Sequence, residues 1–158
     1  MKSSKADFQN LAILNSEFFT NSTLKKFNSK LPHLKELSLL NCPKITTELL
    51  TILPSFTFLE KIKLEGLPLL DFTSSFFFSE KSIVLTLPKL KTVFLKNCQG
   101  ISELNLHCQA LESLQIQDCL KVLFILFLFY LNNNNDNDNN NNNNNKRFQK
   151  LTLINVHL

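Results

Sequence analysis

The residue spacing that recurs along this chain is clearest in Leu90-Lys-Thr-Val93-Phe-Leu95-Lys-Asn-Cys98-Gln-Gly-Ile101. Apolar residues occupy its first, fourth, sixth and twelfth positions, and a cysteine occupies the ninth. Side chains of an extended strand alternate between two faces, so Val93 and Leu95 should point to a core while their neighbours point to solvent. The stretch therefore predicts a short strand followed by a sharp turn at Cys98.

The same spacing occurs six times, with copies that begin at residues 8, 34, 59, 90, 111 and 148. The ninth position is cysteine in three copies, and the others carry Ser16, Leu67 and Val156. The first copy begins with Phe8 and closes with Phe18. A small side chain suits a turn where the backbone leaves a strand. We therefore expect imperfect turns in the third and sixth copies, which should be the least stable.

This spacing resembles the leucine-rich repeat, whose template is L-x-x-L-x-L-x-x-N/C with a closing apolar residue. The resemblance implies an α/β fold, a leucine-rich repeat solenoid bent into a horseshoe arc. Its parallel concave sheet would have about six short strands, with short helices or extended segments on the convex side. The copies begin 26, 25, 31, 21 and 37 residues apart. Residues 1–158 are expected to form a single leucine-rich repeat domain.

Between the expected strands, the apolar residues of 46–53 predict a short helix with Thr46 or Thr47 as its N-cap. Residues 101–106 alternate between apolar and polar side chains and predict a second, short extended segment. The Phe-rich segment 72–82 fits either a helix or a loop buried by its aromatic residues.

Two further segments stand out by composition. Residues 122–131 are all apolar, but a membrane-spanning helix needs about 20 such residues, so packing in the core or on the convex side is favoured. The run is also uncharged, free of proline and aggregation-prone. Residues 132–145 are asparagine except for Asp136 and Asp138. This tract has nothing to bury, which predicts a disordered poly-Asn insertion in a convex loop.

The overall composition is that of an ordinary soluble domain. Hydrophobic residues make up 44% of the chain and the formal net charge is +4. Lysine and glutamate are interspersed, so neither nucleic-acid nor membrane binding is predicted. No apolar segment follows the basic residues at the N-terminus, which favours a cytoplasmic or nuclear location. The Asn21-Ser22-Thr23 sequon is then expected to remain unmodified.

The chain has no motif for catalysis, metal binding or a cofactor. No nucleophile elbow, phosphate-binding loop or dinucleotide-binding turn occurs in it, so no enzymatic activity is expected. The four cysteines form no C-x-x-C pair, and no metal site is predicted. Cys98 and Cys119 should lie on neighbouring strands, where a disulfide is geometrically feasible. An intracellular location favours reduced, buried thiols instead.

The resemblance implies a non-catalytic module that binds a protein partner on its concave face. The partner-binding residues we expect there are Lys61, Lys63, Phe94, Lys96 and Gln115. An exposed aromatic side chain beside several lysines suits an acidic partner. The alternative interpretation is that the lysines only keep this face soluble.

Two other functions are compatible with the sequence. The chain could be a truncated or degenerate repeat fragment without autonomous function, since its last copy ends at Leu158 without a polar cap. Cysteine at the ninth position also resembles the repeats of ubiquitin-ligase substrate receptors. That resemblance implies a substrate-recruiting adaptor, although no F-box precedes the first copy. The sequence determines neither the partner nor the oligomeric state.

Overall fold

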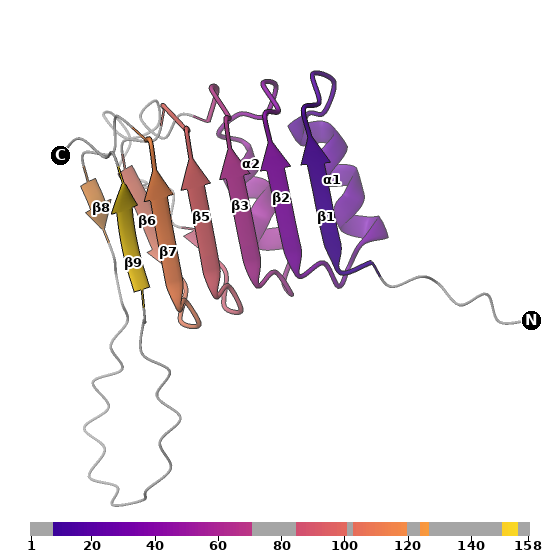
Figure 1. The fold of residues 1–158 in the computed structure, drawn as a ribbon. Coiled ribbons are helices and arrows are strands. Elements are labelled where there is room, and N and C mark those ends of the chain that lie inside the picture. The colour runs from indigo at the N-terminus through magenta and orange to yellow at the C-terminus, as the bar shows by residue number, and fades with distance from the viewer. Residues whose placement is uncertain (1–7, 71–84, 101–102, 120–123, 127–149, 155–158) are drawn as a thin grey trace, which may run out of the picture.

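The chain folds around a main sheet of six parallel strands, arranged in the order in which they occur in the sequence (Figure 1). The computed structural model describes residues 8–70, 85–100, 103–119, 124–126 and 150–154. The strands are β1 (Asn10–Leu14), β2 (Glu36–Leu40), β3 (Lys61–Glu65), β5 (Thr92–Lys96), β7 (Ser113–Gln117) and β9 (Lys150–Ile154). Each lies where one copy of the sequence spacing predicts it, which confirms the α/β class and the parallel sheet.

All six strands pair without a shift in register, so that equivalent positions of the copies lie side by side. The second and fourth residues of β2, β3, β5 and β7 are buried, whereas the alternate residues are more exposed. Leucine, isoleucine and valine at these buried positions form one continuous hydrophobic core behind the sheet. This is the alternation that the sequence predicts for a half-buried strand.

The far side of the core differs along the chain. Behind β1–β3 it is formed by helices α1 (Asn21–Lys30) and α2 (Leu49–Ile52) and the 3-10 turn η1 (Leu53–Ser55). Towards β7 and β9 it carries a second parallel sheet of β4 (Leu85–Thr86), β6 (Glu103–His107) and β8 (Phe124–Leu126) (Figure 1). Residues 103–106 of the extended segment predicted at 101–106 are therefore confirmed as part of β6. Strand β8 lies within the apolar run 122–131.

Helix α1 was not predicted from the periodicity, although its start carries clear signals. Thr20 is its N-cap, and the Thr20 hydroxyl accepts a hydrogen bond from the backbone N–H of Thr23. Phe19 and Leu24 flank the cap at the positions of a hydrophobic staple, and both are buried in the core. Asn21 is also buried and donates a hydrogen bond to Thr46, 2.6 Å away. In the folded chain this amide is therefore poorly accessible to modification.

Helix α2 confirms the helix predicted near 46–53, but its expected cap is wrong. The residue at the N-cap is Glu48, whose side chain makes no capping hydrogen bond. The Thr46 hydroxyl accepts a hydrogen bond from the Asn21 amide and another, at 3.4 Å, from the backbone N–H of Glu48. Thr46 therefore ties α1 to the turn before α2.

The first copy of the spacing is assigned incorrectly at both ends. Phe8 is 61% exposed, whereas its counterpart Leu34 is fully buried. Phe18 is 83% exposed, and the neighbouring Phe19 takes the expected closing position with 6% exposure. We call the ninth position of each copy its corner. In the first copy, as in the later ones, the closing apolar residue thus follows the corner by three residues.

Every strand from β1 to β7 in the main sheet is followed by one residue in the left-handed backbone conformation. These residues are Asn15, Asn41, Gly66, Asn97 and Asp118, with φ between 50° and 62°. Their backbone N–H groups continue the ladder by donating to the next strand. Asparagine, aspartate and glycine tolerate this conformation better than other residues. The turn is therefore determined by the eighth position of the copy, one residue before the cysteine.

This finding corrects the expectation for the third copy. Leu67 occupies the corner in place of cysteine, and it is fully buried. The preceding Gly66 provides the left-handed residue, and Leu70 donates its N–H to the Leu67 carbonyl as Ile45 does to Cys42. An apolar corner side chain therefore does not prevent the turn. Val156 of the sixth copy, the segment 72–82 and the tract 132–145 lie outside the described residues.

Candidate functional site

The five residues predicted to bind a partner all lie on one side of the main sheet, which we call the open face. It consists of the first, third and fifth residues of each strand in the main sheet. Its middle row, in the order of the strands, is Ala12, Ser38, Lys63, Phe94, Gln115 and Thr152. Because the strands are in register, side chains 21–37 residues apart in sequence are direct neighbours on this face.

Lys63 and Phe94 form the centre of the middle row. They are paired across β3 and β5, and the Lys63 ammonium lies 5.3 Å from the centroid of the Phe94 ring. Gln115 follows on β7. A cation over an aromatic face is stabilised by the ring quadrupole. Three of the predicted residues are therefore brought together in the order that the sequence spacing implies.

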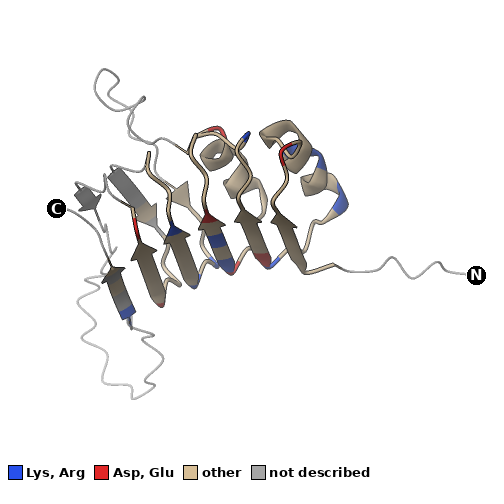
Figure 2. Cartoon of the chain, turned by 45° about the horizontal axis from the view of Figure 1, so that its top comes forward, with Lys and Arg blue, Asp and Glu red and all other residues tan. Residues whose placement is uncertain are grey.

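The lysines of the open face are not an isolated basic cluster, as Figure 2 makes visible. Lys61 bonds to Glu36 at 3.0 Å, and Lys63 bonds to Glu65 at 3.1 Å. Lys96 lies 3.8 Å from the other carboxylate oxygen of Glu65. These groups are partly exposed, so each pair contributes little to stability. Their main effect is on the surface potential: the face is a mixed-charge network with four lysines and two glutamates.

The sequence analysis missed the role of the two glutamates on this face. Glu36 is directly opposite Lys61 in the register, and Glu65 is directly opposite Lys96. Cross-strand pairs of opposite charge can be found by aligning the copies on their first position. The signal was therefore present in the sequence.

A second charged row runs along the residues that precede the strands. Lys35, Glu60, Lys91 and Glu112 occupy equivalent places and alternate in sign from one strand to the next. The hydrogen bond from Lys91 lowers the pKa of the Glu60 carboxyl, and the same bond raises the pKa of the Lys91 ammonium. The alternation thus places opposite charges on neighbouring strands along this row.

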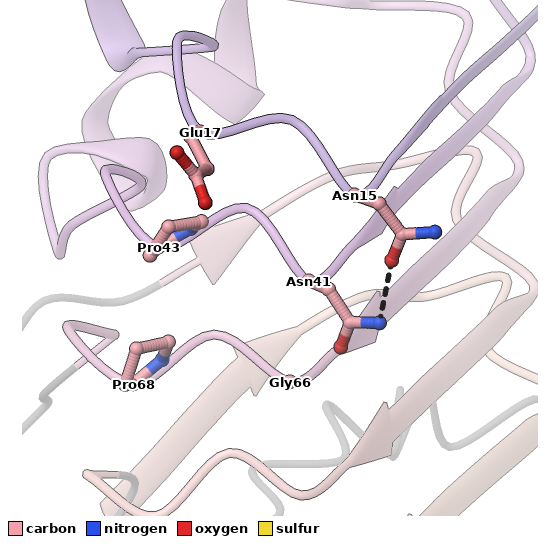
Figure 3. Close-up of a pocket in the computed structure, with 6 residues that line it drawn as sticks. All are labelled: Asn15, Glu17, Asn41, Pro43, Gly66 and Pro68. Atoms are coloured by element: carbon pink, nitrogen blue, oxygen red, sulfur yellow. Dashed lines mark hydrogen bonds between the residues drawn. The ribbon is translucent and has the colours of Figure 1, made fainter.

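One shallow pocket lies at the turns that follow β1–β3 (Figure 3). It has a volume of about 350 Å³ and is lined by Asn15, Glu17, Asn41, Pro43, Gly66 and Pro68. The amide of Asn41 donates a hydrogen bond to Asn15 at 2.8 Å. A Cβ atom at residue 66 would collide with the Asn41 side chain, so Gly66 leaves room for it. The residues of this pocket mainly shape the turns.

All four cysteines are buried free thiols. The corner thiols of Cys42 and Cys98 lie within hydrogen-bonding distance of strand carbonyl oxygens at 3.4–3.8 Å. They thus act as weak donors to backbone acceptors. Burial raises the pKa of the Cys108 thiol to about 11. Buried thiols of this kind are poor nucleophiles.

Cys98 and Cys119 occupy neighbouring corners and interact with each other. A hydrogen bond between the two thiols, together with burial, raises the pKa of Cys98 well above its usual range. The same hydrogen bond lowers the pKa of Cys119 to about 7. The two residues are neighbours as the spacing predicts, and both remain reduced in this structure.

The residues that the structure describes contain no group of three or more histidine, cysteine, aspartate or glutamate side chains that could hold a metal ion. Within the same ranges, no helix is both long and apolar enough to cross a membrane.

Comparisons with known proteins do not assign the chain to a family. No protein-family model, no curated protein and no solved structure matches it. The functional argument therefore depends on the geometry of the open face itself.

Proposed function

We propose that this chain is a leucine-rich repeat solenoid that binds a protein partner on its open face, without catalysing a reaction. The in-register strands, the recurrent left-handed turn residue and the buried corner cysteines support the solenoid. In such an architecture the main sheet lines the concave side of a horseshoe arc, which presents its side chains to a partner.

The observation that carries the proposal is the position of Phe94. Its ring lies in the middle row of the open face, with β3 on one side and β7 on the other. It is half-buried and has the Lys63 ammonium against it. Aromatic side chains at the centre of an interface, surrounded by polar groups, often contribute much of the binding energy. Phe94 is thus the proposed anchor, and Lys61, Lys63, Lys96 and Gln115 surround it.

The charges of the face favour a partner with both apolar and acidic groups. Four lysines against two glutamates give the open face a formal charge of +2. A carboxylate of the partner near Lys63 or Lys96 would compete with Glu65 for these ammonium groups. Affinity for such a partner should fall with increasing salt, since exposed ion pairs are screened.

A photo-crosslinking residue at Gln115 tests the proposal in an extract of the cells that make the protein. We expect a discrete adduct that disappears when Phe94→Ala and Lys63→Glu are combined. The matched control combines Phe58→Ala with Lys89→Glu, because Lys89 lies 3.8 Å from the Phe58 ring outside the open face. This control should keep the adduct.

Two results would contradict the proposal. One is an adduct that persists in the Phe94 and Lys63 variant, and the other is an adduct lost equally in both double variants. Unfolding in urea should be measured for each variant, because only variants that stay folded are compared.

A further inference from the structure

The strand at the N-terminal end of the main sheet is incompletely covered. Leu11 and Ile13 of β1 are only partly buried, whereas their neighbours Leu37 and Leu39 on β2 have at most 1% exposure. Leu14, on the open face, is 58% exposed. In Figure 1, β1 forms the end of the sheet, with α1 behind it. Apolar side chains at this end are therefore available to a further layer.

The backbone of β1 is also available for pairing. The Gln9 carbonyl accepts hydrogen bonds from the backbone N–H groups of Lys35 and Glu36, and Asn15 donates one to Leu40, so the odd-numbered residues of β1 bond towards β2. Because alternate residues of a strand bond to opposite sides, Asn10, Ala12 and Leu14 direct their N–H and C=O groups away from β2. Within the described part of the chain, β2 is the sole strand paired with β1.

Nothing in β1 opposes pairing with another strand. Natural edge strands usually carry a charge, a proline or a bulge that prevents association. The sequence of β1 is Asn-Leu-Ala-Ile-Leu, which contains no charge, no proline and no glycine. The strand at the other end of the sheet, β9, carries Lys150.

The strand is complementary to itself. In an antiparallel pair centred on Ala12, Ala12 faces its own equivalent and Asn10 faces Leu14 of the second copy. Leu11 then lies opposite Ile13 on the core side, which completes the cover that both lack in one chain. No like charges meet, and one strand provides both halves of a twofold interface.

We propose that two copies of this chain form a twofold dimer by antiparallel pairing of their β1 strands about Ala12. The dimer joins two open faces into one continuous surface. The inference rests on β1 alone and does not depend on what the open face binds.

Two substitutions at Ala12 test the dimer on the full chain, with mass measured by light scattering across a concentration series. Ala12→Pro removes a donor that points away from β2, so the fold should remain while the dimer is lost. Ala12→Lys places two ammonium groups against each other and should weaken dimerisation at least about tenfold. The matched control is Ser38→Lys, which adds the same charge to the same row on the next strand and should leave the dimer intact.

Hydrogen exchange of the unmodified chain provides a second measurement. The amides of Ala12 and Leu14 should become protected as the concentration rises, whereas those of Leu11 and Ile13 should be protected throughout. A monomer at all concentrations overturns the proposal. So does a dimer that forms without protection of Ala12, or one that both Ala12 variants leave unchanged, because its interface would lie elsewhere.

Discussion

The strands of the main sheet follow the same pattern in both of its halves, but the layer that covers the core behind them differs. Behind β1–β3 the core is closed by helices, and towards β7 and β9 it is closed by a second parallel sheet. The paired positions of β1, β2 and β3 are 26 and 25 residues apart, whereas those of β5 and β7 are 21 apart. A helix advances about 1.5 Å per residue and a strand about 3.3 Å, so a helix needs more residues to span the same layer.

The difference shows that the two sides of this fold are determined separately. The apolar spacing determines the strand and its register, and the left-handed residue at the eighth position determines the turn after it; these are the same in both halves. The number of residues before the next copy limits what can close the back but does not determine it alone, because the 31-residue interval between β3 and β5 contains strand β4. A short copy can return only as an extended segment, as β6 does.

The largest effect should come from equivalent core residues in the two halves. Leu39 and Leu95 occupy the same position on β2 and β5, and each is at most 2% exposed. Replacement of either by alanine should lower the free energy of unfolding by about 2–5 kcal/mol. If the halves unfold as one unit, each variant shifts a single urea transition, followed by circular dichroism. Two transitions, with only the helical one moved by Leu39→Ala, would mean that the halves are independent.

Gly66 lies at the junction of the halves, and its replacement by alanine should be the next most costly. The left-handed conformation and the collision with Asn41 together should lower the free energy of unfolding by about 2–4 kcal/mol. Asn41→Gly in the same chain removes the collision and should recover part of this loss. The four proteins of this cycle are compared by urea unfolding. Purely additive losses would show that the Asn41 side chain is not the obstacle.

A pH effect should be specific to the half backed by the second sheet. Burial raises the pKa of Cys108 to about 11 from the usual 9.0, so the folded state retains a proton that the unfolded state releases. Stability from this group is complete below pH 9 and is lost as the pH rises to 11, by up to about 2–3 kcal/mol. Between pH 8 and pH 10.5, the free energy of unfolding measured in urea should fall less for Cys108→Ala than for the unmodified chain. Equal losses would contradict the assignment.

Much of the main sheet could be predicted from the sequence, because the signals for its strands are local and repeated. The inward residues of β2, β3, β5 and β7 all follow from the spacing, and so does the row that places Lys63, Phe94 and Gln115 together. The ion pairs of Glu36 and Glu65 were missed because they depend on contacts between copies. They become visible only when the register is applied to every outward position.

The turns and the far side were harder to predict for different physical reasons. The ninth-position cysteine drew attention because it is conspicuous, but the backbone conformation depends on the residue before it, such as Asn97. Helix α1 has a weak apolar periodicity, since only Asn21 and Leu24 within it are buried. Its start is better indicated by Thr20 than by any pattern inside the helix.

The smallest predicted effect tests that statement about α1, the longest element that distinguishes the helical half. Thr20→Ala removes the hydroxyl that caps the backbone N–H of Thr23, so it should lower the free energy of unfolding by about 1 kcal/mol. The matched control is Thr51→Ala, because Thr51 is exposed and its hydroxyl donates to the carbonyl of Glu48, the N-cap residue of α2. Its effect should stay within about 0.5 kcal/mol. Thr20→Ser should restore the cap, and equal stability of Thr20→Ala and Thr51→Ala would mean that packing of Phe19 and Leu24 alone determines where α1 begins.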